Sequence, residues 1–187
     1  AAPGAAGDVQ VPAGGAAYLA TAIRTLREAN PNSQVVSAGD LISASPLVSA
    51  LFLDEPTIYA MNMIGLDYNA VGNHEFDRGR AELLRIANGG CERNTPREPC
   101  AIDPDFPGAR FGYLAANVIT AQGGTLFPGT AIKDFGAVQV GIIGMTTTET
   151  KTLVTPAGVA GLTFADEAAT ANAAVPALKA AGADAIV

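Results

Sequence analysis

The sequence lacks three features that would each indicate a particular class of protein. No apolar run among its 187 residues is long enough to cross a bilayer, so no transmembrane segment is expected. No basic run is present, and 18 acidic residues outnumber 11 basic ones for a formal charge of -7. This balance argues against a nucleic-acid polymer or an anionic membrane as partner. At the amino end no basic residue precedes an apolar core, so no signal peptide is predicted there.

Cysteine is also scarce. Cys91 and Cys100 are the only two, and they lie in a stretch rich in Pro, Arg and Asn. Because no His or further Cys lies nearby, a zinc site is not indicated. A local disulfide that closes this loop is the favoured interpretation, and it would suit an oxidising compartment. Two free thiols, or two unrelated loop residues, are the alternatives.

Short apolar segments alternate with helical patterns along the chain. Apolar residues at helical spacing predict helices over 14–30, 47–53, 56–64, 79–87 and 166–181. Short β-branched runs predict buried strands at 34–38, 69–71, 113–118 and 184–187, and 125–135 with 137–145 suggest a hairpin. With no interdomain linker, this alternation predicts one α/β layered domain with a largely buried sheet.

Polar side chains follow two of the predicted strands directly. Asp40 comes after the first strand, and Asn73 and His74 come after the second, at the strand ends where α/β folds usually build their sites. Carboxylate, amide and imidazole together suit a hard or borderline divalent metal. Asp77, three residues after His74, would orient the imidazole and stabilise its charged form. Taken alone, Gly-Asp also suits a simple turn, and a lone His also suits a structural role.

The string Gly-Asn-His-Glu-Phe-Asp occupies residues 72–77, and two predicted helices and one predicted strand separate it from Gly39-Asp40. This combination is far more specific than Gly-Asp alone or Asn-His alone. The stretch over 11–79 resembles bacterial 5'-nucleotidases of the calcineurin-like metallophosphoesterase superfamily. Residues 113–118 and 140–147 lie where that family has its next two characteristic segments. The resemblance covers nearly the whole chain, and it implies a layered α/β/β/α metallophosphoesterase-like sandwich.

By this resemblance the chain would belong to a metal-dependent phosphomonoester hydrolase that acts on nucleotides. Asp40 would bridge two divalent metal ions (Mn, Zn, Mg or Ca), and Asn73 would ligate the second. His74 would sit over the substrate phosphate and stabilise the transition state or the leaving oxygen, with Asp77 as its partner. The metals would activate a water molecule and neutralise the charge of the phosphate. An acidic chain needs a local positive element to bind a phosphate, and a bound metal ion would supply it. Arg78 is expected to face solvent rather than substrate, and no substrate-binding residue is assigned.

The sequence departs from the family pattern at two places. The family opens with a strand that ends in Asp-x-His; the nearest string here is Asp8-Val9-Gln10, which lacks the His and has no predicted strand before it. The family also supplies further histidines beyond the position of Val187, whereas His74 is the sole histidine of this chain. The resemblance thus implies a partial metallophosphoesterase domain over 1–187, incomplete at both ends. It would lack the C-terminal substrate-binding domain, bind metal incompletely and be inactive alone.

Three functional hypotheses follow. The first is a fragment of a secreted, periplasmic or cell-surface bacterial 5'-nucleotidase whose partner is a nucleotide or another small phosphoester. The second is a non-catalytic binding module on the same scaffold, which the missing motifs favour and the retained polar residues argue against. The third is a sibling hydrolase, such as a cyclic-nucleotide phosphodiesterase, a nucleotide-sugar hydrolase or a thiosulfate-handling enzyme, because specificity lies mostly in the family's C-terminal domain. The sequence specifies no oligomeric state.

Overall fold

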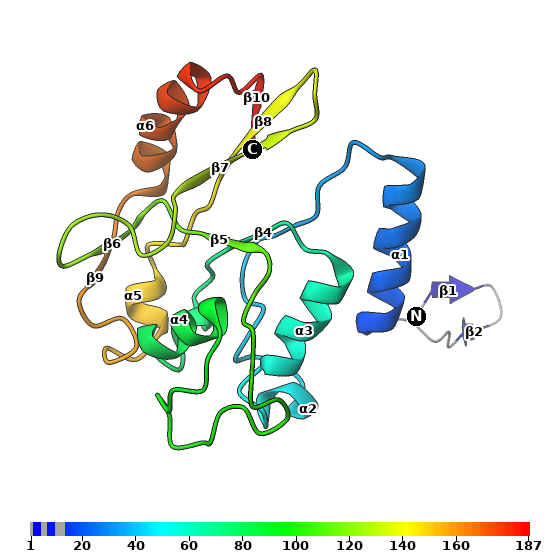
Figure 1. Cartoon of the computed structure of the whole chain (residues 1–187), viewed down its shortest axis with the longest axis vertical. Coiled ribbons are helices and arrows are strands. Elements are labelled where there is room, and N and C mark those ends of the chain that lie inside the picture. The colour runs from blue at the N-terminus through cyan, green and yellow to red at the C-terminus, as the bar shows by residue number, and fades with distance from the viewer. Residues whose placement is uncertain (1, 5–6, 10–13) are drawn as a thin grey trace. The chain divides into compact units, whose positions relative to one another are not determined.

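The computed structural model describes residues 2–4, 7–9 and 14–187, and the chain divides into two compact units, 1–33 and 34–187 (Figure 1). The first unit contains two short antiparallel strands, β1 (Ala2–Gly4) and β2 (Gly7–Val9), and the helix α1 (Ala16–Ala29). The helix confirms the prediction for this segment.

The prediction that no strand precedes Asp8 is wrong. Asp8 itself lies in β2, where it pairs with Pro3 of β1. The pairing is only three residues long, too short to give an alternating pattern that sequence reading could detect. Gln10 and residues 11–13, where the family resemblance begins, lie outside the described residues.

The second unit is built on two three-stranded sheets and one strand pair (Figure 1). The first sheet has the parallel order β3 (Val36–Ser37), β4 (Tyr68–Ala70), β5 (Gly112–Leu114). The second sheet has the order β10 (Ala185–Ile186), β8 (Gln139–Ile143), β7 (Thr130–Asp134), with β10 parallel and β7 antiparallel to β8. The antiparallel pair consists of β6 (Val118–Thr120) and β9 (Leu162–Phe164).

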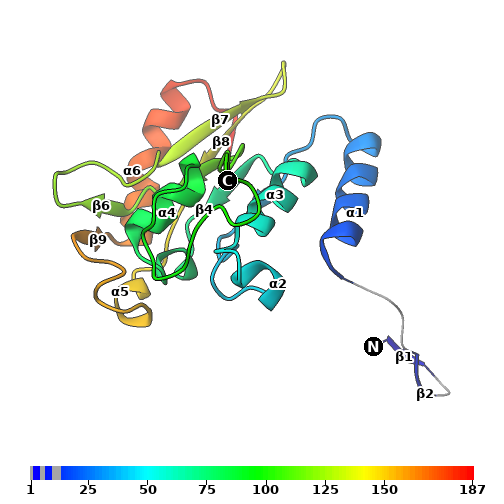
Figure 2. The same ribbon diagram turned by 60° about the horizontal axis from the view of Figure 1, so that its bottom comes forward.

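Helices lie on both sides of these sheets. They are α2 (Leu47–Ala50), α3 (Glu55–Ile64), the 3-10 turn η1 (His74–Phe76), α4 (Arg80–Asn88), α5 (Thr150–Leu153) and α6 (Glu167–Ala180). Helix α6 packs on β7 and β8, while α3 and α4 lie on the other side of the two sheets (Figures 1 and 2). The layered α/β/β/α fold predicted from the sequence is thus confirmed. Among the described residues, no helix has the length and apolar character needed to cross a membrane.

One apolar core joins the α3 and α4 layer to the first sheet. Ile58 of α3, Leu83 and Ile86 of α4, and Val71 and Phe76 beyond β4 are all fully buried in it. The large side chains at these positions make the burial favourable by roughly 1.5–3 kcal/mol each. Because Val71 and Phe76 flank the polar string 72–75, the core fixes the backbone on both sides of it.

The segment 113–118, predicted as one strand, is divided in the structure. β5 ends at Leu114 and β6 begins at Val118. Between them the N–H of Ala115 donates to the carbonyl of Pro128, and the N–H of Ala116 donates to the carbonyl of Gly144. The chain therefore changes hydrogen-bonding partners as it leaves the first sheet. The elements α5 and β9 were not predicted, because four and three residues are too few for a periodic pattern.

Candidate active site

The carboxyl ends of β3 and β4 lie side by side because the two strands are parallel neighbours. The turns that follow approach closely: a Cβ atom on Gly39 would lie 2.4 Å from the nitrogen of Gly72, so only glycine fits there. Oδ1 of Asp40 accepts a hydrogen bond from the N–H of His74 at 3.0 Å. The structure therefore brings Asp40, Asn73 and His74 to one edge of the sheet. Their roles as ligands and catalyst stay predictions.

His74 and Asp77 form a pair across one turn of η1. Nδ1 of His74 lies 2.7 Å from Oδ2 of Asp77, since three residues per turn place i and i+3 on the same side of a 3-10 helix. Between them in sequence, Phe76 is fully buried and packs edge-on against Phe164, with the two ring centroids 5.6 Å apart. The side chains of His74 and Asp77 remain 38% and 36% exposed, so the core holds the turn while the pair stays accessible.

Asp77 also determines the charge of the imidazole. Its hydrogen bond raises the pKa of His74 above the ordinary value, and the negative charges of Asp77, Asp40 and Glu75 act in the same direction, against a smaller opposing effect of burial. The protonated imidazole is therefore favoured. With Nδ1 directed to Asp77, Nε2 is the ring nitrogen that can donate to a substrate.

Glu75, which the sequence analysis quoted without a role, clamps the two strand-end turns together. Its carboxylate is 1% exposed. Oε2 accepts from the N–H groups of Asp40 at 2.8 Å and Gly72 at 2.9 Å, and Oε1 accepts from the N–H of Leu41 at 2.9 Å. Burial raises the pKa of Glu75, and the hydrogen bonds from Leu41 and Asp40 oppose that rise. These bonds hold Asp40 at φ +58°, a left-handed conformation that non-glycine residues rarely adopt.

A signal for Glu75 was present in the sequence. Two glycine-rich turns at adjacent strand ends leave backbone N–H groups without strand partners, and buried N–H groups need an acceptor. The one carboxylate inside the string 72–76 is that of Glu75. Its position three residues after Gly72 allows it to reach back to both turns.

Hydrogen bonds of Asn117, between β5 and β6, and of Thr146, after β8, support the same edge. The fully buried Asn117 donates to the carbonyl of Thr146 at 2.6 Å and accepts from its N–H at 2.9 Å. The Thr146 hydroxyl donates to the carbonyl of Val71 at 2.7 Å. The two later segments of the family resemblance, 113–118 and 140–147, are thereby connected to the turn that carries Asn73 and His74. Neither Asn117 nor Thr146 was singled out from the sequence.

The described residues fit part of a divalent metal site. Asp40 and Asn73 offer a carboxylate and an amide oxygen at one sheet edge, which is the chemistry that hard cations prefer. The part of the chain that the structure describes contains no group of three or more His, Cys, Asp or Glu side chains that could hold a metal ion. Since Zn²⁺ takes about four ligands and Ca²⁺ about six to eight, these residues do not complete a site by themselves.

The expectation that Arg78 faces solvent is wrong. Its side chain is only 20% exposed, because Nη1 forms an ion pair with Oδ2 of the fully buried Asp54. Burial alone would raise the pKa of Asp54, but hydrogen bonds from Ser45, Ser43 and Arg78 together lower it. Arg78 and Asp54 are 24 residues apart in the chain, so no local pattern indicated the pair.

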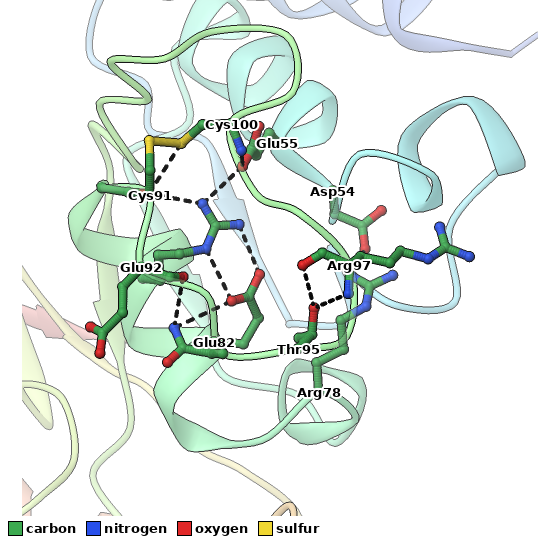
Figure 3. A network of polar contacts seen from close by, with 12 residues as sticks. Asp54, Glu55, Arg78, Glu82, Cys91, Glu92, Thr95, Arg97 and Cys100 are labelled. Carbon is green, nitrogen blue, oxygen red and sulfur yellow. Dashed lines mark hydrogen bonds and ion pairs between the residues drawn. A yellow bond between two sulfur atoms is a disulfide. The ribbon is translucent and has the colours of Figure 1, made fainter.

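Cys91 and Cys100 form the predicted disulfide, with their Cα atoms 5.6 Å apart (Figure 3). We call residues 91–100 the disulfide loop. Its end is fastened to α3, since the N–H of Cys100 donates to Oε1 of Glu55 at 2.9 Å. The buried Arg85 pairs with both Glu55 and Glu82 at 2.8 Å and donates to the carbonyl of Gly90 at 3.0 Å.

Comparison with known proteins finds a 5'-nucleotidase among the relatives of this chain. No family model matches the chain. An uncharacterized protein of Acinetobacter calcoaceticus is 55% identical over 136 residues, which are 72% of this chain and 67% of that protein. Endonuclease YhcR of Bacillus subtilis is 38% identical over 170 residues, covering 90% of this chain and 13% of its own. The snake venom 5'-nucleotidase of Gloydius brevicauda is 34% identical over 160 residues, which are 82% of this chain and 24% of that protein.

Solved structures give the same result. A 5'-nucleotidase precursor from Thermus thermophilus matches with a TM-score of 0.74 and 28% identity, over 92% of this chain and 30% of that one. The calcineurin-like phosphoesterase YfkN from Bacillus subtilis matches with a TM-score of 0.68 and 29% identity, over 90% of this chain and 51% of that one. The chain belongs to the 5'-nucleotidase family of calcineurin-like phosphoesterases. The family resemblance drawn from the string 72–77 is therefore confirmed.

This member of the 5'-nucleotidase family spans only part of most of these relatives. It covers about a quarter of the venom 5'-nucleotidase, at 24%, and 13% of the endonuclease. The family is that of nucleotide phosphoester hydrolases.

Proposed function

We propose that this chain forms part of the catalytic domain of a 5'-nucleotidase-type phosphomonoesterase. The observation that carries the proposal is the His74–Asp77 pair, with its atoms 2.7 Å apart, beside Asp40 at the same sheet edge. A protonated imidazole at a solvent-accessible edge can donate to the oxygen on which charge develops when a phosphoester bond breaks. The 5'-nucleotidases among its relatives support a nucleotide as the substrate.

Each residue then has a separate task. Asp77 orients the imidazole and keeps it protonated, and Nε2 of His74 contacts the phosphate or the leaving oxygen. Asp40 and Asn73 would contribute oxygen ligands to two divalent ions. When bound, such ions supply an activated water and neutralise phosphate charge. Glu75 holds the backbone of Asp40 in place through the bonds described above.

We further propose that residues 1–187 are one part of a metallophosphoesterase domain in a longer protein. Other segments of that protein would complete the metal site and provide the substrate-binding domain. Two observations support this proposal: the described residues offer no group of three metal ligands, and the chain covers 24% of the venom 5'-nucleotidase. The metal could be Mn, Zn, Mg or Ca, all of which accept oxygen ligands.

We place this protein outside the cytoplasm, as secreted, periplasmic or bound to the cell surface of a bacterium. The disulfide between Cys91 and Cys100 supports the proposal, because disulfides persist in oxidising compartments. A venom 5'-nucleotidase among the relatives is consistent with secretion.

The experiment is a comparison of the isolated chain with the full gene product that contains it. The gene product should hydrolyse AMP in the presence of a divalent metal, and the isolated chain should do so no faster than a buffer blank containing manganese or zinc. Strong metal-dependent turnover by the isolated chain would overturn the ligand assignment. If the gene product hydrolyses cyclic AMP or a nucleotide sugar but not AMP, it is a sibling hydrolase. If it binds nucleotides without hydrolysing any, it is a binding module.

A further inference from the structure

A pocket of about 470 Å³ opens beside Asp77. Its walls are formed by Leu53 and by three segments: residues 77–79 after η1, the disulfide loop with Thr95 and Arg97, and residues 155, 157 and 158 after α5. His74 does not line this pocket, whereas its partner Asp77 does. The pocket is therefore a neighbour of the His74–Asp77 pair and separate from the Asp40 edge where the metals are proposed.

Two arginines line this pocket, and their guanidinium groups approach the same backbone carbonyl. Nη1 of Arg97 donates to the carbonyl of Ala50 at 3.0 Å, and Nη2 of Arg78 reaches the same carbonyl at 3.5 Å. Figure 3 shows the Arg78 and Arg97 side chains extending to the same side, next to Asp54. Asp54 neutralises Arg78, but Arg97 forms no ion pair with any acidic residue in the described part of the chain.

The fold holds Arg97 in position rather than leaving it on a free loop. The disulfide closes the loop at both ends, and Glu55 and Arg85 fasten those ends to α3 and α4. Within the loop, the N–H of Arg97 donates to Oγ1 of Thr95 at 3.2 Å. A side chain on an ordered loop loses less conformational freedom when it binds a ligand, which favours affinity.

The charge of the lining indicates the ligand. In a chain of net charge -7, this pocket carries two arginines and a single acid, Asp77, whose charge is shared with His74. The planar guanidinium matches the paired oxygens of phosphate, and the charge of Arg97 is not balanced by an ion pair among the described residues. Thr95 and Thr155 add hydroxyl groups to the same walls.

We propose that this pocket binds a phosphate group, with Arg97 as the principal contact and Arg78 as the second. The site goes beyond the proposed function, because it needs neither the metals nor turnover. Either free inorganic phosphate or the phosphate of a small organic ester would satisfy this chemistry. The pocket exceeds the size of a bare phosphate, and its Leu53, Pro96 and Ala157 could cover an organic group.

The test is calorimetric titration of the isolated 187-residue chain at constant ionic strength and without added metal. Inorganic phosphate and ribose 5-phosphate are the two probes. Saturable binding of one phosphate per chain is expected, and Arg97→Ala should weaken it about tenfold, the loss that follows from removing one charge-assisted contact. Much tighter binding of ribose 5-phosphate would identify the ester as the source, and equal binding would identify free phosphate.

The matched control is Arg93→Ala, which removes an exposed arginine from the same loop. Arg93 pairs with Glu98 and is 57% exposed, so this variant should bind phosphate like the unchanged chain. Because Arg97 is exposed, both variants should unfold at the same temperature as the parent. Three results would each overturn the proposal: no saturable binding of either probe, full binding by Arg97→Ala, or an equal loss in Arg93→Ala, which would indicate general charge screening.

Discussion

Nδ1 of His74 and Oδ2 of Asp77 lie 2.7 Å apart at the two ends of a single 3-10 turn. Phe76, between them in sequence, is fully buried. The same three-residue turn thus anchors itself in the core and presents a carboxylate-bound imidazole at the surface. This arrangement makes the charge of His74 depend on Asp77 more than on any other residue.

Asp77→Asn should therefore lower the pKa of His74. The neutral amide cannot stabilise the imidazolium as the carboxylate does. The chain has one histidine, so its imidazole proton signals in a ¹H NMR pH titration are unambiguous. The control Asp134→Asn, at the exposed last residue of β7, should leave the pKa of His74 unchanged. An unchanged pKa in Asp77→Asn would show that the pair does not set the charge.

The same pair predicts how stability depends on pH. Since folding raises the pKa of His74 above 6.5, its protonation stabilises the folded state. That contribution is fully present below the unfolded pKa and disappears as the pH rises through the folded pKa. Urea unfolding at about pH 5.5 and about pH 8.5 should show a larger loss of stability for Asp77→Asn at the acidic pH. A larger loss at the alkaline pH would contradict the assigned direction.

Glu75→Gln should destabilise the fold. The glutamine amide presents hydrogen-bond donors to N–H groups of Asp40, Leu41 and Gly72 that now donate to the carboxylate. Leaving such buried groups unsatisfied costs about 1–3 kcal/mol. Urea unfolding measures the loss. Glu98→Gln, at a side chain 74% exposed, is the control and should change little. Equal stabilities of the two variants would mean that the hydrogen bonds of the Glu75 carboxylate do not stabilise the two strand-end turns.

Arg85→Met should cost more than any surface substitution. Arg85 is the shared partner of the buried Glu55 and Glu82, and removing it leaves two buried carboxylates without their cation. Breaking a buried ion pair in this way costs about 3–5 kcal/mol. Arg93→Met is the matched control, because its ion pair with Glu98 is exposed. A loss of stability no greater than that of the control would show that the network contributes little.

The sequence predicted what local patterns determine. Periodicity located α1, α3, α4 and α6 within a few residues, and the string 72–77 located the sheet edge of the candidate site. It did not predict contacts between distant segments. Glu75 accepts from Asp40 and Leu41, which are 35 and 34 residues earlier, and Arg78 pairs with Asp54, 24 residues earlier. Such pairs depend on how the strands are ordered in the sheet, and no single segment carries that information.

The break between β5 and β6 has the same origin. Residues 113–118 are apolar enough for one strand. The position at which the chain leaves the first sheet is set by carbonyl groups of Pro128 and Gly144, which belong to segments further along the chain. Apolar character predicted burial of this stretch correctly, but it could not show which partners each residue would have.

The most direct test is the rate of AMP hydrolysis by the gene product that contains these residues, with and without His74→Ala. If His74 donates to the phosphate or to the leaving oxygen, the variant should be slower by roughly a hundredfold or more, the usual loss for a positioned acid or electrostatic stabiliser. Asp77→Asn should lose less, since it only orients and charges the imidazole. The control Arg93→Ala should retain the full rate. A His74→Ala protein that hydrolyses AMP as fast as the parent would contradict the account and would make the string 72–77 a structural feature.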